Sequence, residues 1–375
     1  MIEFAEYQTI VIELRPDVRI HTESKMKTAE PAVLKAWDIS DAIPTPSATL
    51  GQILHFAMRC AVLALSSHNS QPWRYKILDN GLLLMLDRRR ALPVVDPYDR
   101  ELIISCGAAL FNIRVALAHA GKRARIDVQP DNLDEDLLVQ LTVDDALPAN
   151  QDVDIAPLFP AITKRTTNRS AFKVAPVAQT IITKMKQAAS AECIKLSVAT
   201  KIHERESIAT LIAAADLAQF QDVRFRRELA SWLHPARSDD GLAAFSGEMK
   251  KILDFATPLA ALIVRTFDVG SGVAADDKAL AAGSPLLACL SSATDDAPAW
   301  LATGQALQRV LLTAVNEGLD ASYLNQPIEV VDFRDTLVSL MHTERFPQLL
   351  LRIGHSASQV MSSHSPRRAL AEVVS

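Results

Sequence analysis

The stretch of sequence that carries most information about the fold is Ser66-Ser67-His68-Asn69-Ser70-Gln71-Pro72-Trp73-Arg74. Apolar residues recur at helical spacing through residues 50–66, which predicts an amphipathic helix leading into this stretch. Beyond it, residues 74–78 and 82–86 flank Asp79-Asn80-Gly81, a strong signal for a tight β-hairpin. The stretch therefore forms a connection between a helix and a hairpin.

The side chains of residues 66–74 allow two interpretations. They include hydroxyls, two carboxamides, an indole and a guanidinium. Asn and Gln both donate and accept hydrogen bonds, and a Ser hydroxyl does either, so these residues match the alternating acceptors and N–H donors along the rim of a flavin ring. A polar turn, with proline before a strand, explains the same residues equally well.

A second pattern repeats along the chain. A helix is predicted at residues 100–120, closed by Gly121, and another at residues 300–317, closed by Gly318. With one offset of 197, the first set falls on the second: Gly107, Ala109, Leu110 and Gly121 on Gly304, Ala306, Leu307 and Gly318. Matches within one helical frame indicate an internal duplication.

Residues 131–160, acidic and proline-bearing, are predicted to connect the two units. This divides the chain into an N-terminal extension (1–48), a first unit (49–160) and a second unit (161–375). The second unit opens with a basic segment, Arg165-Thr166-Thr167-Asn168-Arg169. Its arginines would share a face of a helix or close around one phosphate in a turn. A solvated basic turn is the alternative.

Other elements are predicted more simply. Residues 178–189 and 204–232 have helical patterns, and residues 347–353 form a candidate buried strand. Residues 269–284 are rich in Gly and Ala, which predicts a mobile loop, and residues 7–14 are a possible strand.

Composition excludes several classes of protein. Hydrophobic residues make up 49% and charged residues 22%, as in ordinary globular proteins. The net charge of −5 provides no basic field for nucleic acid or an anionic membrane. No apolar stretch approaches the ~20 residues that span a bilayer, and the acidic start does not resemble a signal peptide. Four scattered cysteines without a CxxC pair predict buried thiols, so we expect a cytoplasmic protein.

Common catalytic motifs are absent from the sequence. It contains no GxxxxGK[ST], no GxGxxG after a strand, no GxSxG and no HExxH, and its nine histidines show no metal-ligand spacing. Ser66, Ser67 and His68 contain a nucleophile and a base, but adjacent residues rarely present such a pair productively. We therefore expect neither hydrolysis nor a metal site.

Together these segments resemble the nitroreductase family, specifically its long, single-chain Acg-like branch. The family pattern of small residues followed by Asn-x-Gln-Pro-Trp matches residues 66–73, and its Arg-Arg-Ser-x-Arg phosphate motif is matched loosely by residues 165–169. Weaker matches, which persuade mainly by their order, extend the resemblance over about residues 50–370: 107–121, 304–318, 324–329, 348–354 and 366–368.

The resemblance implies an α+β, nitroreductase-like fold with antiparallel-rich sheets and surrounding helices. Family members usually work as homodimers with two FMN sites at the interface, whereas this chain is expected to hold two fused units as a pseudo-dimer. Each unit keeps only one of the two motifs, which implies one composite site and one FMN per chain. We expect either a monomer or a homodimer.

The resemblance also assigns the site residues. Those implied to approach the flavin ring are Ser66, Ser67, His68, Asn69, Gln71 and, from the second unit, Gln326. Those implied to approach the phosphate are Arg165, Thr166, Asn168, Arg169, Arg367 and Arg368. Trp73 is expected in the core rather than stacked on the ring, and no single catalytic acid or base is required, because the cofactor carries the chemistry.

The implied function is an FMN-dependent oxidoreductase. It would take a hydride from NADH or NADPH and pass electrons to a nitro compound, a quinone or a similar small-molecule acceptor, by a ping-pong route. The resemblance also allows a flavin-binding or flavin-storage protein, in which the loop at residues 269–284 covers the ring. A duplicated fold without flavin is a third possibility.

Overall fold

The structure is a computed structural model, and it describes residues 32–130, 134–148, 151–234, 238–243, 257–357 and 364–375. The strand predicted at residues 7–14 lies outside them. The described part of the predicted extension at residues 1–48 contains two short 3-10 helices, η1 (Ala32–Trp37) and η2 (Ser40–Ala42).

The first half of the described chain builds a four-stranded antiparallel sheet in the order β1-β2-β4-β3. Its strands are β1 (Trp73–Leu78), β2 (Gly81–Leu86), β3 (Ala124–Val128) and β4 (Leu137–Val143). β1 and β2 form the predicted hairpin around Asp79 and Asn80, with Trp73 opposite Leu86. The prediction of a mere connection at residues 131–160 is wrong, because it misses β4, which is paired on both sides.

Helix α1 (Leu50–Ala61) precedes this sheet, as predicted. Its first turn is fixed by a capping box, in which the Thr49 hydroxyl accepts from the Gln52 backbone N–H and the Gln52 side chain accepts from the Thr49 N–H at 2.8 Å. Phe56, Met58 and Cys60 are fully buried in the core beneath the sheet. Trp73 is fully buried in the same core, as expected.

The second half builds another four-stranded antiparallel sheet, in the order β5-β8-β10-β9. Its strands are β5 (Lys195–Ala199), β8 (Leu286–Ser292), β9 (Asp320–Tyr323) and β10 (Phe346–Gly354). Every residue of β8 is buried, because β8 is a central strand with side chains packed on both faces. β10 confirms the strand predicted at residues 347–353.

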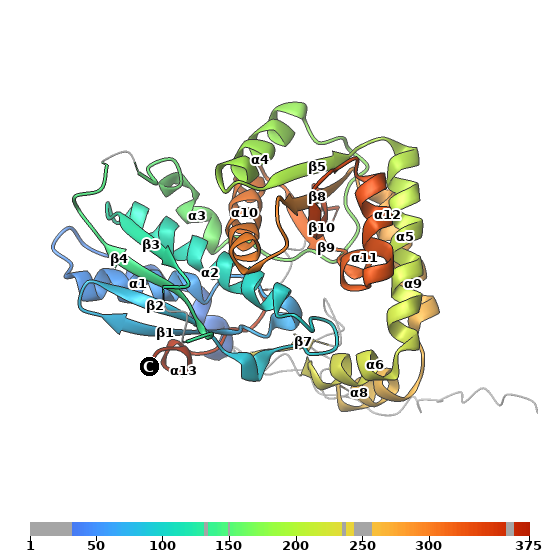
Figure 1. Cartoon of the computed structure of the whole chain (residues 1–375), viewed down its shortest axis with the longest axis horizontal. Helices are drawn as coiled ribbons and strands as arrows, with labels where there is room; N and C mark the ends of the chain where they lie inside the picture. The colour runs from blue at the N-terminus through green and yellow to red at the C-terminus, as the bar shows by residue number, and fades with distance from the viewer. Residues whose placement is uncertain (1–31, 131–133, 149–150, 235–237, 244–256, 358–363) are drawn as a thin grey trace, which may run out of the picture. The chain divides into compact units, whose positions relative to one another are not determined.

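Helices α2 (Arg100–His119) and α10 (Ala297–Asn316) pack side by side between the two sheets (Figure 1). A Cβ at Gly107 would lie 3.0 Å from the Gly304 Cα, and a Cβ at Gly304 would lie 2.8 Å from the Gly107 Cα. Such contacts are tighter than close packing allows, so both positions require glycine. Gly121 and Gly318 adopt φ of +69° and +73° just after the two helices, as predicted.

The expectation that no apolar segment approaches the length of a membrane span is wrong for α2, a 20-residue helix that is apolar enough to cross a bilayer. However, 83% of its apolar window is buried inside the protein. α2 is therefore the central helix of the core.

Further helices and short strands surround this framework. They are η3 (Ser67–Asn69), η4 (Arg88–Arg90), η5 (Ala156–Leu158), α3 (Phe159–Ile162), α4 (Gln179–Ala191), α5 (Ile202–Gln221), α6 (Val223–Ser231), α8 (Thr257–Thr266), α9 (Gly270–Gly283), α11 (Gln326–Glu329), α12 (Val331–Leu340), α13 (Leu370–Val373), β6 (Leu233–His234) and β7 (Leu242–Ala243). α5 and α9 pack along each other beside the second sheet (Figure 1).

Three local predictions need correction. The single helix predicted at residues 204–232 is two helices, because Asp222 ends α5 and its side chain caps the first turn of α6. The mobile loop predicted at residues 269–284 is the helix α9, in which the Ala-rich sequence outweighs the glycines. All four cysteines are free, but Cys193 is exposed rather than buried.

Candidate functional site

A cavity of about 450 Å³ is lined by elements from both halves of the described chain. The first half contributes residues 65–69 and the start of α2, and the second half contributes residues 165–169, α5, α9, α11 and β10. Its size falls within the ~300–1,000 Å³ of typical small-molecule sites. The two sequence motifs, about a hundred residues apart, thus meet at one cavity.

Most of the predicted site residues line this cavity: Ser66, Ser67, His68, Asn69, Arg165, Arg169, Gln326 and Arg367. The remaining four, Gln71, Thr166, Asn168 and Arg368, do not. Their side chains contribute to the surroundings of the cavity instead.

The loop at residues 66–71 has an unusual backbone. His68, Asn69 and Gln71 have φ of 51°, 54° and 52°, a region that residues other than glycine and asparagine rarely occupy. Such conformations persist only where surrounding contacts hold them, and they concentrate at functional sites. Here the Ser66 hydroxyl accepts from the Gln71 N–H at 2.9 Å, and the Ser67 hydroxyl donates to Glu101 of α2.

The C-terminal tail also holds this loop. Arg367 donates to the Asn69 side-chain oxygen at 2.8 Å, and the backbone N–H of Arg368 donates to the Gln71 side-chain oxygen at 2.9 Å. Gln71 in turn donates to the Asp239 carbonyl at 2.8 Å. Gln71 and Arg368 thus use their hydrogen bonds to hold the loop against the tail, which explains why neither lines the cavity.

Residues 165–169 are neither a helix nor a tight turn. Thr167 forms a β-bridge with Ala321 of β9, and the Asn168 N–H donates to the Ala321 carbonyl at 3.0 Å. Side chains alternate along such an extended segment, so Arg165, Thr167 and Arg169 line the cavity while Thr166 and Asn168 do not. The Asn168 amide instead donates to Asp320 at 2.8 Å.

One end of the cavity, which we call the arginine end, gathers Arg165, Arg169 and Arg367. The Arg165 and Arg367 guanidinium groups each lie 3.4 Å from the Leu63 carbonyl, and both side chains are almost fully buried. The Nε atoms of both have no hydrogen-bond partner among the described residues. Burial and the neighbouring Arg165 hold the pKa of Arg367 well below its ordinary value. This end therefore holds cationic donors in excess of acceptors.

A second part of the cavity wall, which we call the carboxylate end, consists of the acidic residues Glu101, Asp216, Asp277 and Glu329, and Arg169 lies near enough to Asp277 for their charges to interact. Glu329 accepts from Gln219 at 2.6 Å and Asp277 accepts from Gln326 at 2.8 Å. Burial, followed by the nearby Asp277 charge, raises the pKa of Asp216 to about 7. Burial and Glu101 raise the pKa of Glu329 well above its ordinary value.

Two further residues of the cavity complete its electrostatics. Burial lowers the pKa of His68 to about 4, so His68 is neutral near pH 7. Arg352 of β10 is 1% exposed, and its guanidinium donates to the carbonyls of Ser170 and Asn168 at 2.9 and 3.0 Å. Arg352 thus fixes the segment that carries Arg165 and Arg169.

Sequence reasoning missed the carboxylate end. Asp216 and Gln219 are one turn apart on α5, and Gln326 and Glu329 are one turn apart on α11, a spacing that places each pair on one helical face. That spacing was the available signal, but it becomes meaningful only when α5 and α11 pack against each other.

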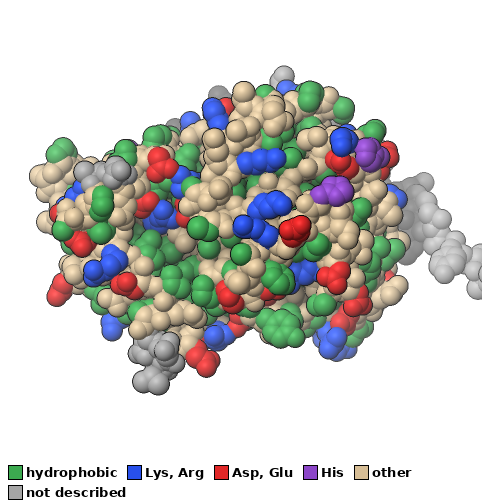
Figure 2. Space-filling view, turned by 45° about the horizontal axis from the view of Figure 1, so that its top comes forward, with side chains coloured by type: hydrophobic (Ala, Val, Ile, Leu, Met, Phe, Trp, Pro, Cys, Tyr) green, Lys and Arg blue, Asp and Glu red, His purple; other side chains and the backbone are tan. Residues whose placement is uncertain are grey.

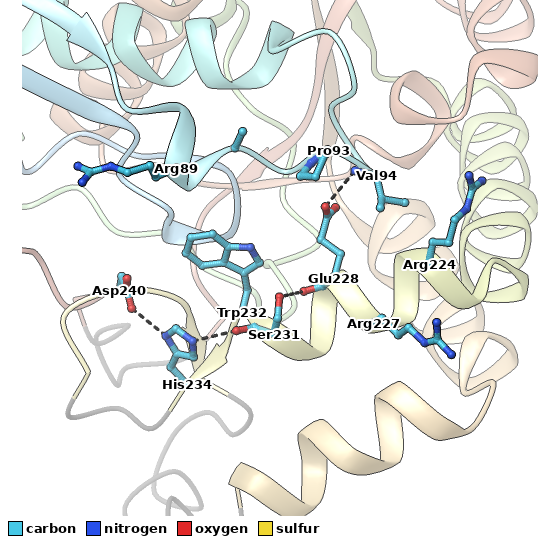
Figure 3. Close-up of a pocket in the computed structure, with 11 residues that line it drawn as sticks. Arg89, Pro93, Val94, Arg224, Arg227, Glu228, Ser231, Trp232, His234 and Asp240 are labelled. Carbon is cyan, nitrogen blue, oxygen red and sulfur yellow. Dashed lines mark hydrogen bonds and ion pairs between the residues drawn. The ribbon is translucent and has the colours of Figure 1, made fainter.

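A second, more open depression of about 610 Å³ lies beside α6 (Figure 3). Glu228 accepts from the Val94 N–H at 2.9 Å, and the His234 ring lies between Asp240 and the Ser231 carbonyl. Glu228 and His234, two polar side chains of the depression, thus already have hydrogen-bond partners in the protein. None of the predicted site residues lines it. We therefore take the cavity, and not this depression, as the candidate site.

Comparison with known proteins decides the family. A Mycobacterium tuberculosis (strain H37Rv) protein whose name places it among the NAD(P)H nitroreductases is 33% identical over 318 residues, 84% of this chain and 88% of that protein. This chain belongs to the nitroreductase family. The M. tuberculosis NAD(P)H nitroreductase named acg is 28% identical over 326 residues, 86% of this chain and 95% of its own length, so the long, Acg-like form predicted from sequence is confirmed.

No family model matches the sequence. The crystal structure of the FMN- and NADPH-dependent nitroreductase NfnB from Sphigopyxis sp. strain HMH covers 58% of this chain and 97% of its own, at 19% identity and a TM-score of 0.39. The α+β class with antiparallel sheets, expected for a nitroreductase, is the architecture described above.

Proposed function

We propose that this nitroreductase-family chain binds one FMN in the cavity, accepts a hydride from NADH or NADPH, and reduces a nitro compound, a quinone or a similar small molecule. The observation that carries the proposal is the arginine end. There, Arg165 and Arg367 are buried side by side, and their Nε donors lack partners among the described residues.

The donor set of the cavity fits this cofactor. Two neighbouring buried guanidiniums without an anionic partner are unfavourable unless a ligand supplies the charge, and a phosphate does so with bidentate geometry. The Tyr323 hydroxyl also lines the cavity and has no hydrogen-bond partner among the described residues. Arg165, Arg169 and Arg367 would hold the phosphate, and Thr167 replaces Thr166 in the predicted set because of the alternation of the extended segment.

The ring would lie against the loop at residues 66–69. The strained backbone of His68 and Asn69 presents this loop to the cavity, while neutral His68 and the Ser66 hydroxyl offer hydrogen bonds without a net charge. Bound FMN supplies the hydride and electron chemistry, and the residues of this chain position it and shield it from water. Gln71, Asn168 and Arg368 would act indirectly, by holding the loop, the extended segment and the tail in place.

We further propose that the chain is an internal pseudo-dimer, with units at residues 49–160 and 161–375. The shared strand order of the two sheets and the reciprocal contact of Gly107 and Gly304 support this, because a two-fold contact pairs equivalent residues. A pseudo-dimer already contains the interface at which the family builds its site, so a monomer with one FMN is the simplest assignment. Four free cysteines support the further proposal of a cytoplasmic location.

An absorbance spectrum tests this function first. Purified protein, with FMN added in stoichiometric amounts and the excess removed, is expected to retain one flavin per chain. Addition of NADPH or NADH without oxygen is expected to bleach the flavin band, and a nitroaromatic or quinone to restore it. Protein that retains no flavin would refute the proposal, and protein that holds FMN but resists both nicotinamides would indicate storage instead.

A further inference from the structure

The carboxylate end of the cavity is not explained by FMN binding. Four carboxyl groups line it, whereas a flavin requires a phosphate site at one end and mixed donors and acceptors along the ring. Asp216 is 1% exposed, and its Oδ2 atom has no hydrogen-bond partner among the described residues. The Gln326 Oε1 atom on the same wall has none either. Both unpartnered atoms accept hydrogen bonds.

In the part of the chain that the structure describes, the arginine end therefore has hydrogen-bond donors without partners, and the carboxylate end has hydrogen-bond acceptors without partners. The arginine end leaves the donors Arg165 Nε and Arg367 Nε free among the described residues, and the carboxylate end leaves the acceptors Asp216 Oδ2 and Gln326 Oε1. Buried acceptors without donors cost free energy unless a ligand or water satisfies them. The missing partner at the carboxylate end is consequently a group rich in N–H donors.

The charges at this end indicate that the missing group is a cation. Asp277 has the cations Arg169 and Arg352 and its helix neighbour Asp276 nearby, whereas Asp216 has, within the described ranges, only Asp277 and the Gln326 side chain. Glu101 is paired with Arg100 at 3.1 Å, and Glu329 has Gln219, the carboxyl of Glu101 and the more distant Arg100 charge as its neighbours. Asp216 thus lacks a close cationic partner among the described residues, whereas the Arg100 charge acts on Glu329, and a bound cation would let Asp216 ionise.

We propose that the carboxylate end binds a protonated amine, through Asp216, Asp277, Glu329 and Gln326. An ammonium group offers three N–H donors to this set of acceptors and supplies the absent positive charge. Combined with the proposed function, on which this step rests, the electron acceptor is a nitro compound or quinone that carries a basic amino group. The binding site for the amine itself does not depend on that function.

Calorimetric titration with benzylamine tests the site without turnover. At pH 8, both the FMN-treated and the untreated full chain are expected to bind benzylamine at least tenfold more tightly than benzyl alcohol, its neutral analogue. Benzyltrimethylammonium, which has the charge but no N–H donors, is expected to bind at least fivefold more weakly than benzylamine. Equal affinity for amine and alcohol, or no binding of the amine, would overturn the proposal.

Substitutions locate the site. Asp216→Asn and Asp277→Asn are each expected to weaken benzylamine binding at least tenfold. Asp276→Asn, which removes an exposed carboxylate next to Asp277 on α9, is expected to change it less than twofold. Unchanged binding in the first two variants would refute the assignment.

A pH series on the unmodified protein gives a test that does not depend on folding of the variants. Asp216, with a pKa of about 7, must ionise to bind a cation, so affinity for benzylamine is expected to rise at least fivefold from pH 6 to pH 8. A flat profile would contradict the role of Asp216. Amine binding without FMN binding would refute the proposed function alone, and the reverse would refute this site alone.

Discussion

The two halves of the molecule have the same framework but different connections. Each half has a helix, two strands, a long helix and two further strands, and the sheets share the order first-second-fourth-third. In the first half, residues 62–72 join α1 to β1 and two residues join β1 to β2. In the second half, residues 192–194 join α4 to β5, while residues 200–285, with α5, α6, α8 and α9, join β5 to β8.

This difference explains why the chain has one composite cavity. Three residues between α4 and β5 leave no room for a counterpart of the loop at residues 66–71. The first half, with its two-residue hairpin, has no counterpart of α5 and α9. The loop of one half and the insertions of the other therefore line the same space. The unequal connections thus provide much of the lining of the candidate site.

On the face shown in Figure 2, basic and acidic side chains are interspersed, without an extended field of one sign. The charged groups that we propose for binding are instead internal, at the arginine and carboxylate ends of the cavity.

The largest expected effect comes from breaking the shared framework. Gly107→Val would drive side-chain atoms into the α10 backbone, which cannot give way, so we expect a loss of about 3 kcal/mol in the free energy of unfolding. Gly304→Val would place side-chain atoms against the α2 backbone in the same way, and it is expected to lower the free energy of unfolding by a similar amount. Urea unfolding measures both, with Gly51→Ala as the control, because a Cβ there meets only the Thr49 hydroxyl at 4.0 Å. Clearly unequal losses would break the comparison between the halves.

Arg165→Met tests what the second half contributes to the site. Loss of a phosphate contact is expected to weaken FMN binding on the order of 30-fold. In the flavin-free protein the same change removes a buried, incompletely paired charge, so we expect the free energy of unfolding to rise by about 1 kcal/mol. Fluorescence titration with FMN and thermal unfolding measure the two effects.

The control for that variant is Arg227→Met, at an exposed arginine of the depression in Figure 3. It is expected to leave FMN affinity unchanged. Equal effects of the two substitutions would mean that the arginine end has no special role.

Asp216→Asn tests the segment at residues 200–285 of the second half, through the pH dependence of the stability of the protein. The pKa of Asp216 is raised from 3.8 to about 7 in the folded protein, so the folded state holds a proton that the unfolded state loses between these values. The contribution of Asp216 to stability therefore falls as pH rises through this window. The Asn side chain cannot ionise. We therefore expect the free energy of unfolding of the variant to exceed that of the parent by about 2 kcal/mol at pH 8 and by little at pH 4.

Urea unfolding at the two pH values measures this difference, and Asp276→Asn is the matched control on α9. A difference between Asp216→Asn and the parent that does not change with pH would show that the pKa of Asp216 is the same in the folded and unfolded states.

The smallest expected effect concerns the outer face of α9. A Cβ at Gly272 meets nothing within 4 Å, so Gly272→Ala is expected to stabilise the protein by about 0.5 kcal/mol through helix propensity alone. Thermal unfolding measures the change. A loss of stability would argue against a continuous helix at residues 270–283.

The sequence alone determined the features that depend on near neighbours. The Asp79-Asn80-Gly81 turn predicted the β1–β2 hairpin, and the 197-residue offset predicted two equivalent helices with Gly107 and Gly304 in register, although not that these helices pack together. Most of the motif residues at the cavity were also accessible, because the loop at residues 66–69 and the arginines belong to recognisable short patterns.

Tertiary structure decided what depends on pairing across the fold. Thr167 rather than Thr166 lines the cavity because residues 165–169 run extended along β9, and β4 exists because two strands offer it hydrogen bonds on both sides. The carboxylate end exists only where α2, α5, α9 and α11 converge. Its four acidic residues lie in separate segments from 101 to 329, and their burial, which raises the pKa of Asp216 and Glu329, is a property of that convergence and of no local sequence.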